Sequence, residues 1–218
     1  MSRLRVSQLD PSGYLRTPWK NGGGVAIDIA GERLGDSAPI TWDDMVWCFG
    51  RTAITSAGPF SDLSGFDRMQ MVVAGRGLVL ESPNGEIDER DPVFVVRFDG
   101  HLPVVTRLES GPVEVVNLIG LQQRVSIDLR TLSAQDTAVL AVGVHVVYAA
   151  FEPCELRCDG IQYALPHDHA LQIECEADVV VVNEAGQAVI GSVFSRGRQL
   201  RTPTTNRLDP PAAANLDG

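Results

Sequence analysis

Apolar and polar side chains alternate with a period of two along most of this chain, and turn-forming dipeptides separate the alternating segments. A period of two is typical of half-buried β-strands, whereas an amphipathic helix needs a period near 3.6 residues. Outside hairpins, strands are predicted at residues 70–73, 93–96, 104–108, 113–119, 139–147, 170–173, 179–182 and 188–194. Residues 44–48 and 61–66 are expected to hold short turns. The pattern therefore predicts an all-β protein, built as a sandwich or jelly roll.

Two hairpins are predicted at corresponding places in the two halves of the chain. Residues 76–87 turn at Asn84-Gly85, and residues 154–163 turn at Asp159-Gly160. These dipeptides favour hairpins because both central residues of a type I′ turn have positive φ. A further strand follows each hairpin, in the second half after a turn at Pro166-His167-Asp168. The repeated order suggests a duplicated β-domain.

The acidic composition excludes one class of partner. The 218 residues carry a formal net charge of −10 with a pI near 4.8, whereas nucleic-acid binding needs a basic face. No apolar segment follows the N-terminus, and the longest apolar stretch, residues 138–151, is interrupted and too short to span a bilayer. We therefore expect a cytoplasmic protein with neither nucleic-acid nor membrane partners. Its cysteines are expected to be reduced and buried: Cys48, Cys154, Cys158 and Cys175.

Lys20 is the only lysine of the chain, and the other 17 basic side chains are arginines. It lies in the segment Trp19-Lys20-Asn21-Gly22-Gly23. A compact ammonium making a short contact cannot be replaced by the planar fork of arginine. The glycines also let the backbone approach a ligand closely. The segment is therefore interpreted as a small polar site, with an ordinary glycine-rich turn as the alternative.

A metal site and a catalytic motif are not predicted. His167-Asp168-His169 followed by Glu174 imitates a cupin metal motif, but no histidine follows His169 to complete the ligand set. The histidines are instead expected at the surface or, for His145, in the core or at a sheet edge with a satisfied ring. Asp88-Glu89 is interpreted as a solvated turn. No cofactor is predicted, and the residues favour a binding protein over an enzyme.

Arg51 and Arg68 are further candidates for a binding site. Alternate strand residues of a jelly roll point into the barrel, where an arginine can hold a carboxylate with two hydrogen bonds. The alternative is that each arginine pairs with a structural carboxylate such as Asp62 or Asp67.

Four motifs occur in order between Pro18 and Ile119: Pro18-Trp19-Lys20-Asn21-Gly22-Gly23-Gly24, Gly58-Pro59-Phe60-Ser61 with Gly65 and Arg68, Phe98-Asp99-Gly100, and Gly111-Pro112-Val113 with Asn117-Leu118. In these motifs the chain resembles the HutD/Ves family. The resemblance implies a bicupin, two double-stranded β-helices in tandem, without an established catalytic activity. It also implies a role as a modulator that senses a metabolite of histidine utilisation. The chain departs from the family pattern at Ala26 and Asp28, where the family tends to have Thr and Glu, and at Val115-Val116, where the family usually has an Asp.

The predicted organisation is a first jelly roll at 1–120, a second at 121–202 and a loosely held tail at 203–218. We expect the first barrel to bind a small carboxylate, of the class of urocanate or a formylated glutamate-type intermediate. The predicted site residues provide positive charge, hydrogen bonds or apolar walls: Trp19, Lys20, Asn21, Gly22, Gly23, Arg51, Phe60, Ser61, Arg68 and Asn117. Two alternatives stay open, a metal-independent isomerase or lyase that uses Lys20 for proton transfer, and a purely structural or partner-binding protein. Homodimer formation is left open.

Overall fold

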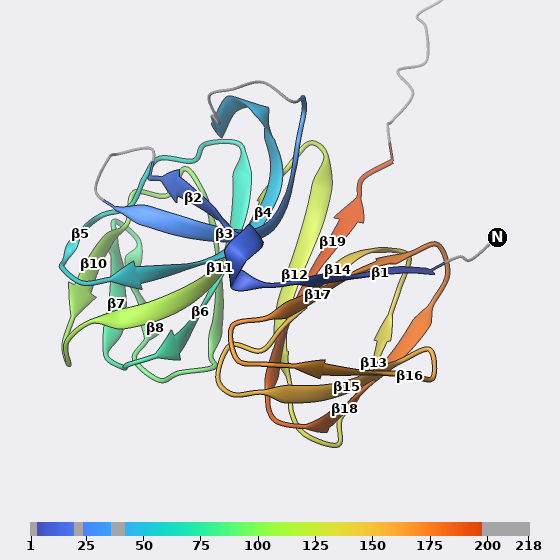
Figure 1. Cartoon of the computed structure of the whole chain (residues 1–218). Coiled ribbons are helices and arrows are strands. Elements are labelled where there is room, and N and C mark those ends of the chain that lie inside the picture. The colour runs from blue at the N-terminus through green and yellow to red at the C-terminus, as the bar shows by residue number, and fades with distance from the viewer. Residues whose placement is uncertain (1–3, 20–23, 36–41, 198–218) are drawn as a thin grey trace, which may run out of the picture.

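The structure, a computed structural model, describes residues 4–19, 24–35 and 42–197. These ranges contain β-strands and two short 3-10 turns and no α-helix, which confirms the all-β prediction. The strands form four antiparallel sheets that close into two barrels lying side by side (Figure 1). Neither 3-10 turn in the described ranges is long enough to cross a membrane.

The first barrel is built from a six-stranded and a four-stranded sheet. The larger sheet has the order β2 (Leu15–Pro18), β3 (Val25–Arg33), β4 (Met45–Ile54), β11 (Val113–Leu121), β6 (Phe66–Ala74) and β9 (Val95–Asp99). The smaller sheet has the order β5 (Gly58–Pro59), β10 (Val105–Leu108), β7 (Leu78–Ser82) and β8 (Gly85–Glu89). The 3-10 turn η2 (Trp42–Asp44) leads directly into β4.

The second barrel has the same two-sheet construction. Its larger sheet has the order β1 (Leu4–Leu9), β17 (Ala170–Cys175), β14 (Gly143–Tyr148), β19 (Ala188–Ser195) and β12 (Val125–Leu132). Its smaller sheet has the order β13 (Thr137–Leu140), β18 (Val179–Ala185), β15 (Cys154–Cys158) and β16 (Ile161–Leu165). The 3-10 turn η1 (Pro11–Gly13) connects the first strand of the chain to β2.

The first strand of the chain belongs to the second barrel. β1 pairs antiparallel with β17, with Leu4 opposite Cys175 and Leu9 opposite Ala170 (Figure 1). The N-terminal residues therefore fall outside the simple division at residue 120 that we predicted, because an edge strand can be supplied by any part of the chain that reaches it. The predicted tail at 203–218 lies outside the described residues.

Some of the predicted turns and strands are confirmed, and others differ from the structure. Asp159 and Gly160 both have positive φ and join β15 to β16, as predicted. Ser82 pairs with Gly85, so the first hairpin turns at Pro83-Asn84, one residue earlier than predicted. Residues 44–48 are not a turn but mostly the start of β4, and the strand predicted at 139–147 is broken at residues 141–142. The sequence pattern hides the break at 141–142 because Val139 and Val142 are apolar although both are exposed.

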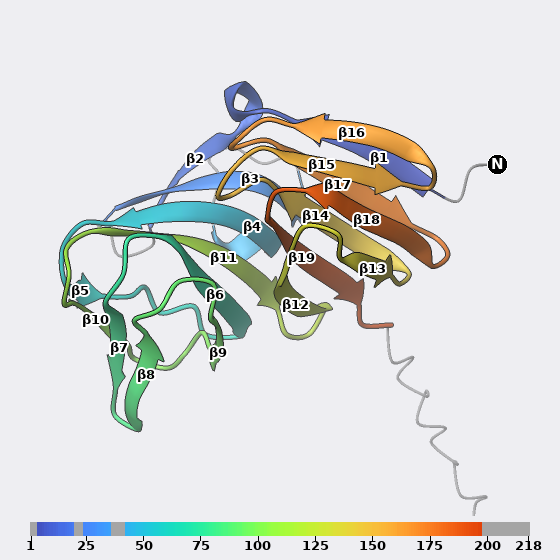
Figure 2. The ribbon, with the colours of Figure 1, turned by 90° about the horizontal axis from the view of Figure 1, so that it is seen from below.

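The two large sheets pack face to face and join the barrels (Figure 2). Phe49 of β4 and Tyr148 of β14 meet edge to face, with ring centres 6.0 Å apart. The inside of the second barrel is filled by a separate apolar cluster that includes Cys154, Cys158 and Cys175. All four cysteines of the chain are buried, as predicted, and no disulfide joins them.

His145 is buried in the second barrel and both of its ring nitrogens have partners. Nδ1 lies 2.9 Å from Ser192 Oγ, and Nε2 lies 2.9 Å from the carbonyl oxygen of Ala141. The prediction of a core histidine with a satisfied ring is therefore confirmed.

Candidate functional site

The large sheet of the first barrel has two faces with different roles. Alternate residues of a strand point to opposite faces. The residues of β4 and β11 that face the barrel interior are Cys48, Gly50, Thr52, Ile54, Val115, Asn117 and Ile119. Between them, Trp47, Phe49, Val116 and Leu118 face the second barrel. One face of this sheet therefore lines a pocket, and the other joins the two barrels.

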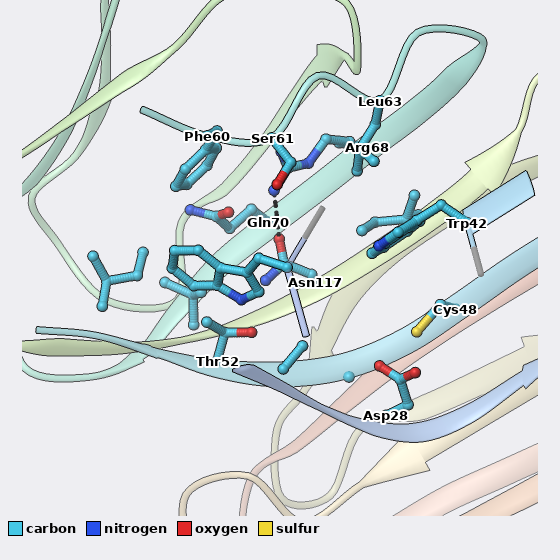
Figure 3. A pocket seen from close by; sticks show the side chains of 16 residues that line it. Asp28, Trp42, Cys48, Thr52, Phe60, Ser61, Leu63, Arg68, Gln70 and Asn117 are labelled. Carbon is cyan, nitrogen blue, oxygen red and sulfur yellow. Dashed lines mark hydrogen bonds between the residues drawn. The ribbon is translucent and has the colours of Figure 1, made fainter. Parts of the chain in front are cut away.

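The pocket is a cavity of about 60 Å³ inside the first barrel. Besides β4 and β11, its walls come from β3, β6, the segment that follows β5, and η2. These elements contribute Ala26, Asp28, Arg68, Gln70, Phe60, Ser61, Leu63 and Trp42, and Trp19 closes the lining beside β2 (Figure 3). Apolar clusters lie at both ends of the barrel interior, so the polar side chains converge on a small, partly enclosed space. This is the common form of a small-molecule site.

Arg68 is the cation of this pocket. It is only 7% exposed, and its guanidinium carbon lies 4.6 Å from the centre of the Phe60 ring and 5.0 Å from that of Phe98. One terminal nitrogen donates to Asn117 Oδ1 over 3.4 Å (Figure 3). No carboxylate of the described chain forms an ion pair with it, and burial lowers the pKa of Arg68 to about 10. Arg68 thus remains charged at neutral pH without a counter-ion in direct contact.

Three polar atoms of the pocket lining are buried without a hydrogen-bond partner among the described residues. They are Trp42 Nε1, Arg68 Nε and Gln70 Oε1. Leaving such an atom unsatisfied costs about 1–3 kcal/mol, so native proteins usually satisfy them with water or a ligand. Two of the three are donors, and one of these is charged. An acceptor that carries negative charge would complement these two donors.

Behind Gln70 lies a buried carboxyl group. Glu89 of β8 has no exposed surface, and its Oε2 accepts a hydrogen bond from Gln70 Nε2 over 2.7 Å. Burial raises the pKa of Glu89 to about 7, against the opposing effects of the Gln70 hydrogen bond and the charge of Arg68. The interpretation of Asp88-Glu89 as a solvated turn is wrong for Glu89, because β8 directs this side chain into the barrel.

Asp28 lines the same pocket from β3, and it has partners of its own. Its Oδ2 accepts from Thr17 Oγ1 over 2.6 Å and from Arg33 over 3.3 Å. Burial, together with the nearby Asp28 carboxylate, raises the pKa of the Cys48 thiol well above its ordinary value. Cys48 is consequently a neutral thiol in the wall of the pocket.

The segment that carries Phe60, Ser61 and Leu63 is fixed by Gly100. Leu63 donates its backbone N–H to the carbonyl of Gly100, and Gly100 donates to the carbonyl of Phe66. A Cβ at residue 100 would lie 2.2 Å from the Leu63 carbonyl oxygen. The Phe98-Asp99-Gly100 motif therefore serves the site indirectly, since only glycine lets this segment approach so closely.

Five of the ten predicted site residues line the pocket: Trp19, Phe60, Ser61, Arg68 and Asn117. Lys20, Asn21, Gly22 and Gly23 lie outside the described residues. The residues that flank them are described, and Trp19 donates its backbone N–H to the carbonyl of Gly24 over 2.9 Å. Of the described residues around this segment, Trp19 and Ala26 line the pocket.

Arg51 is not a pocket residue, which corrects our prediction. It lies between Gly50 and Thr52 on β4 and points to the opposite face of the sheet. There it pairs with Glu114 over 2.8 Å and with Asp168 of the second barrel over 2.9 Å. The structural alternative is correct for Arg51, although its partners are not the carboxylates that we named.

The His167-Asp168-His169 segment forms a turn, as predicted, and Asp168 has a positive φ of 67°. Tyr148 donates to Asp168 Oδ1 over 2.6 Å, and Tyr14 donates to the backbone carbonyl of Asp168 over 2.6 Å. Asp168 is therefore part of a contact between the barrels. In the part of the chain that the structure describes, no group of three or more His, Cys, Asp or Glu side chains is placed to hold a metal ion.

Sequence reasoning missed Trp42, Cys48, Thr52 and Gln70 as pocket residues. A usable signal was nevertheless present, because Ala26, Asp28 and Val115, where the chain departs from the family pattern, all line the pocket. Gln70 also stands two residues after Arg68 on one strand, so the two side chains share a face.

Comparison with known proteins identifies the family. The HutD family model matches residues 12–190. The chain belongs to the HutD family. A Pseudomonas putida relative described as an uncharacterized 21.2 kDa protein in the hutC 3′ region is 28% identical over 163 residues, covering 73% of this chain and 80% of that protein.

Solved structures agree with this assignment. HutD from Pseudomonas fluorescens SBW25, solved in a formate condition, matches with a TM-score of 0.71 and 26% identity, over 88% of this chain and all of that one. The conserved protein PA5104 of Pseudomonas aeruginosa PAO1 matches with a TM-score of 0.73 and 21% identity, over the same shares. Salicylate 1,2-dioxygenase from Pseudoaminobacter salicylatoxidans matches in fold, with a TM-score of 0.56 and 9% identity over 91% of this chain and 87% of that one. This HutD-family protein has the bicupin fold that its sequence predicted.

Proposed function

We propose that this HutD-family protein binds a small carboxylate metabolite in its first barrel and acts as a modulator of histidine utilisation without catalysing a reaction. The observation that carries the proposal is Arg68. A buried arginine is normally paired with a carboxylate, yet Arg68 contacts only Asn117 and two aromatic rings in the described part of the chain. A bound carboxylate would supply the missing counter-ion.

The remaining lining supports an anion of small size. Trp42 Nε1 and Arg68 Nε are unsatisfied donors, and Phe60 and Trp19 offer apolar walls. Charge-assisted hydrogen bonds to a carboxylate are roughly twice as strong as neutral ones. Lys20 would add a second cation from the segment between Trp19 and Gly24, and this contribution is part of the proposal.

The comparisons support the ligand class and the pathway. The P. fluorescens HutD structure was solved in a formate condition, and formate is the smallest carboxylate. The P. putida relative is placed by its description in the hutC 3′ region. Urocanate and formylated glutamate-type intermediates each combine a carboxylate with further polar groups, and they are the ligand class that we would test first.

The test is a titration of the purified protein with formate, urocanate and N-formylglutamate. Trp19 and Trp42 line the pocket, so tryptophan fluorescence can report binding, with calorimetry as a second readout. Arg68→Met should weaken binding of each bound carboxylate by about 10- to 100-fold, the scale of a lost charge-assisted hydrogen bond.

The matched control is Arg97→Met, which removes an arginine that is paired with Asp67 at the surface. This variant should bind as the wild type does. Equal affinity in the wild type and in Arg68→Met, with both folded, would refute the proposal. Turnover of a bound metabolite, followed by chromatography, would instead identify an enzyme that uses the same pocket.

A further inference from the structure

Gln70 and Glu89 form a buried pair at the wall of the pocket. The Gln70 carboxamide has two ends, a donor NH₂ and an acceptor oxygen. Its Nε2 donates to Glu89 Oε2 over 2.7 Å, and Gln70 itself lines the cavity with no exposed surface. The pair therefore connects a carboxyl group outside the cavity lining to a polar group inside it.

The charge of Glu89 decides which end of Gln70 faces the ligand. An ionised carboxylate has only acceptors, so the Gln70 NH₂ group must turn toward Glu89. The carboxamide oxygen is then directed away from Glu89, and Figure 3 shows it on the side of the pocket where Arg68 and Asn117 lie. The reverse orientation would place two acceptors against each other in a buried site.

Gln70 Oε1 is buried and has no hydrogen-bond partner among the described residues. Arg68 does not satisfy it, since one terminal nitrogen of Arg68 donates to Asn117 Oδ1 and its Nε has no partner among the described residues. A ligand that brings an O–H or N–H group to this oxygen satisfies it, whereas a ligand that brings a methyl group leaves it unsatisfied. A buried oxygen left without a hydrogen bond costs free energy. This cost is what allows a polar binding site to reject an analogue of its ligand that lacks the hydroxyl group.

We propose that Gln70 selects carboxylates with an O–H or N–H donor next to the carboxylate group, and that Glu89 is the positioning residue that sets this selectivity by holding the Gln70 carboxamide. The inference rests on the proposed function, because the carboxylate contact to Arg68 places the donor beside Gln70. It adds the requirement that the ligand carries a hydrogen-bond donor beside its carboxylate, which the contact with Arg68 alone does not impose.

Glycolate and propionate are suitable probes, because they have nearly the same shape and differ in a hydroxyl and a methyl group. For each protein we take the ratio of its glycolate affinity to its propionate affinity. At pH 8 this ratio should be about fivefold higher for the wild type than for Gln70→Met, as expected for one net hydrogen bond. The ratio of the two affinities is the readout, which removes the difference in hydration between the probes. Tryptophan fluorescence of the intact protein supplies both affinities.

Glu89→Gln keeps the shape of the side chain and removes the charge that fixes Gln70, so the glycolate preference should fall toward that of Gln70→Met while both probes still bind. The matched control is Glu86→Gln, the same change on the same strand at an exposed position, which should keep the wild-type ratio. In the Gln70→Met background, Glu89→Gln should leave the ratio unchanged, because Glu89 acts through Gln70.

The outcomes separate the inference from the function on which it rests. Tight binding of both probes with the same ratio in the wild type, Gln70→Met and Glu89→Gln overturns the selectivity and leaves the carboxylate site intact. An effect of Glu89→Gln that persists in the Gln70→Met background overturns the positioning role of Glu89. Binding of neither probe by the wild type, together with no effect of Arg68→Met on any carboxylate, overturns the proposed function and the inference with it.

Discussion

Arg51 of the first barrel donates a hydrogen bond to Asp168 of the second barrel over 2.9 Å. The same guanidinium donates to Glu114 over 2.8 Å, and the other Asp168 oxygen accepts from Tyr148 over 2.6 Å. These half-buried groups lie at the margin of the apolar contact between the two large sheets. The turn at Asp168 and the side chain of Arg51 therefore form a polar contact that joins the two barrels.

Arg51→Met should destabilise the protein without weakening ligand binding. The substitution leaves the two carboxylates of Asp168 and Glu114 without their shared cation, which we expect to cost about 2–3 kcal/mol. For a chain of this length, that corresponds to a fall in melting temperature of roughly 5–10 °C. Arg97→Met, at an exposed ion pair, should change the melting temperature little. A loss of ligand affinity with an unchanged melting temperature would place Arg51 in the site after all.

Lys20→Met should weaken carboxylate binding by about 1.5–3 kcal/mol, the scale of a charge-assisted hydrogen bond, and should barely change stability. Lys20→Arg should also bind poorly, because the larger planar fork does not replace a compact ammonium. Titration and thermal melting of both variants test this prediction. Full binding together with a melting temperature several degrees lower would mean that Lys20 is structural.

Arg68→Lys should bind a carboxylate about tenfold more weakly than the wild type. The guanidinium of Arg68 lies over the rings of Phe60 and Phe98, and a planar cation uses this position and its several donors better than an ammonium does. Calorimetric titration of the folded variant gives the difference. Arg97→Lys is the control, and equal affinities of Arg68→Lys and the wild type would show that the pocket needs only a point charge.

Carboxylate affinity should rise as the pH falls from 8 to 6. The pKa of Glu89 is about 7, above the ordinary 4.5, and the charged group that faces it is Arg68. Protonation of Glu89 removes a nearby negative charge that opposes an anion beside Arg68, so an anion binds this form more tightly. One linked proton limits the gain to about tenfold over these two pH units. The Glu89→Gln variant should show a flat profile, and a wild-type affinity that falls toward pH 6 would contradict the assignment.

The raised pKa of Glu89 also determines how the stability of the folded protein depends on pH. Because the folded protein holds the Glu89 proton more strongly than the unfolded chain, this group contributes most to stability below about pH 4.5. The contribution is lost as the pH rises through about 7. Glu89→Gln should therefore gain stability relative to the wild type at pH 8 more than at pH 5, as measured by urea unfolding at the two values.

The sequence predicts this fold well where strands alternate cleanly, as in β15 and β16 around Asp159-Gly160. It fails where both faces of a strand are buried. In β4, Trp47, Cys48 and Phe49 are all apolar and all buried, so the pattern does not reveal which residues face the pocket. The assignment of Arg51 to the site failed for this reason, whereas Arg68 was found through its motif.

Buried polar residues are the second limit. Glu89 stands beside Asp88 in the sequence and resembles any solvated carboxylate, although the two side chains point to opposite faces of β8 and only Asp88 is exposed. The partner that makes its burial tolerable, Gln70, is 19 residues away on β6. Local sequence carries no trace of such a pair, and the same holds for the pairing of β1 with β17.

The two faces of β4 and β11 place the pocket lining and the contact between the barrels on alternate positions of the same strands. Substitutions at Cys48, Thr52 or Val115 can reshape the pocket while Phe49 and Leu118 keep the barrels joined. A single-residue insertion within β4 would disturb both the pocket and the contact between the barrels. Beyond the insertion, side chains that face the pocket would turn toward the second barrel, and those that face the second barrel would turn into the pocket. Variation within such a family is therefore expected to change ligands through point substitutions and to conserve the length of these strands strictly.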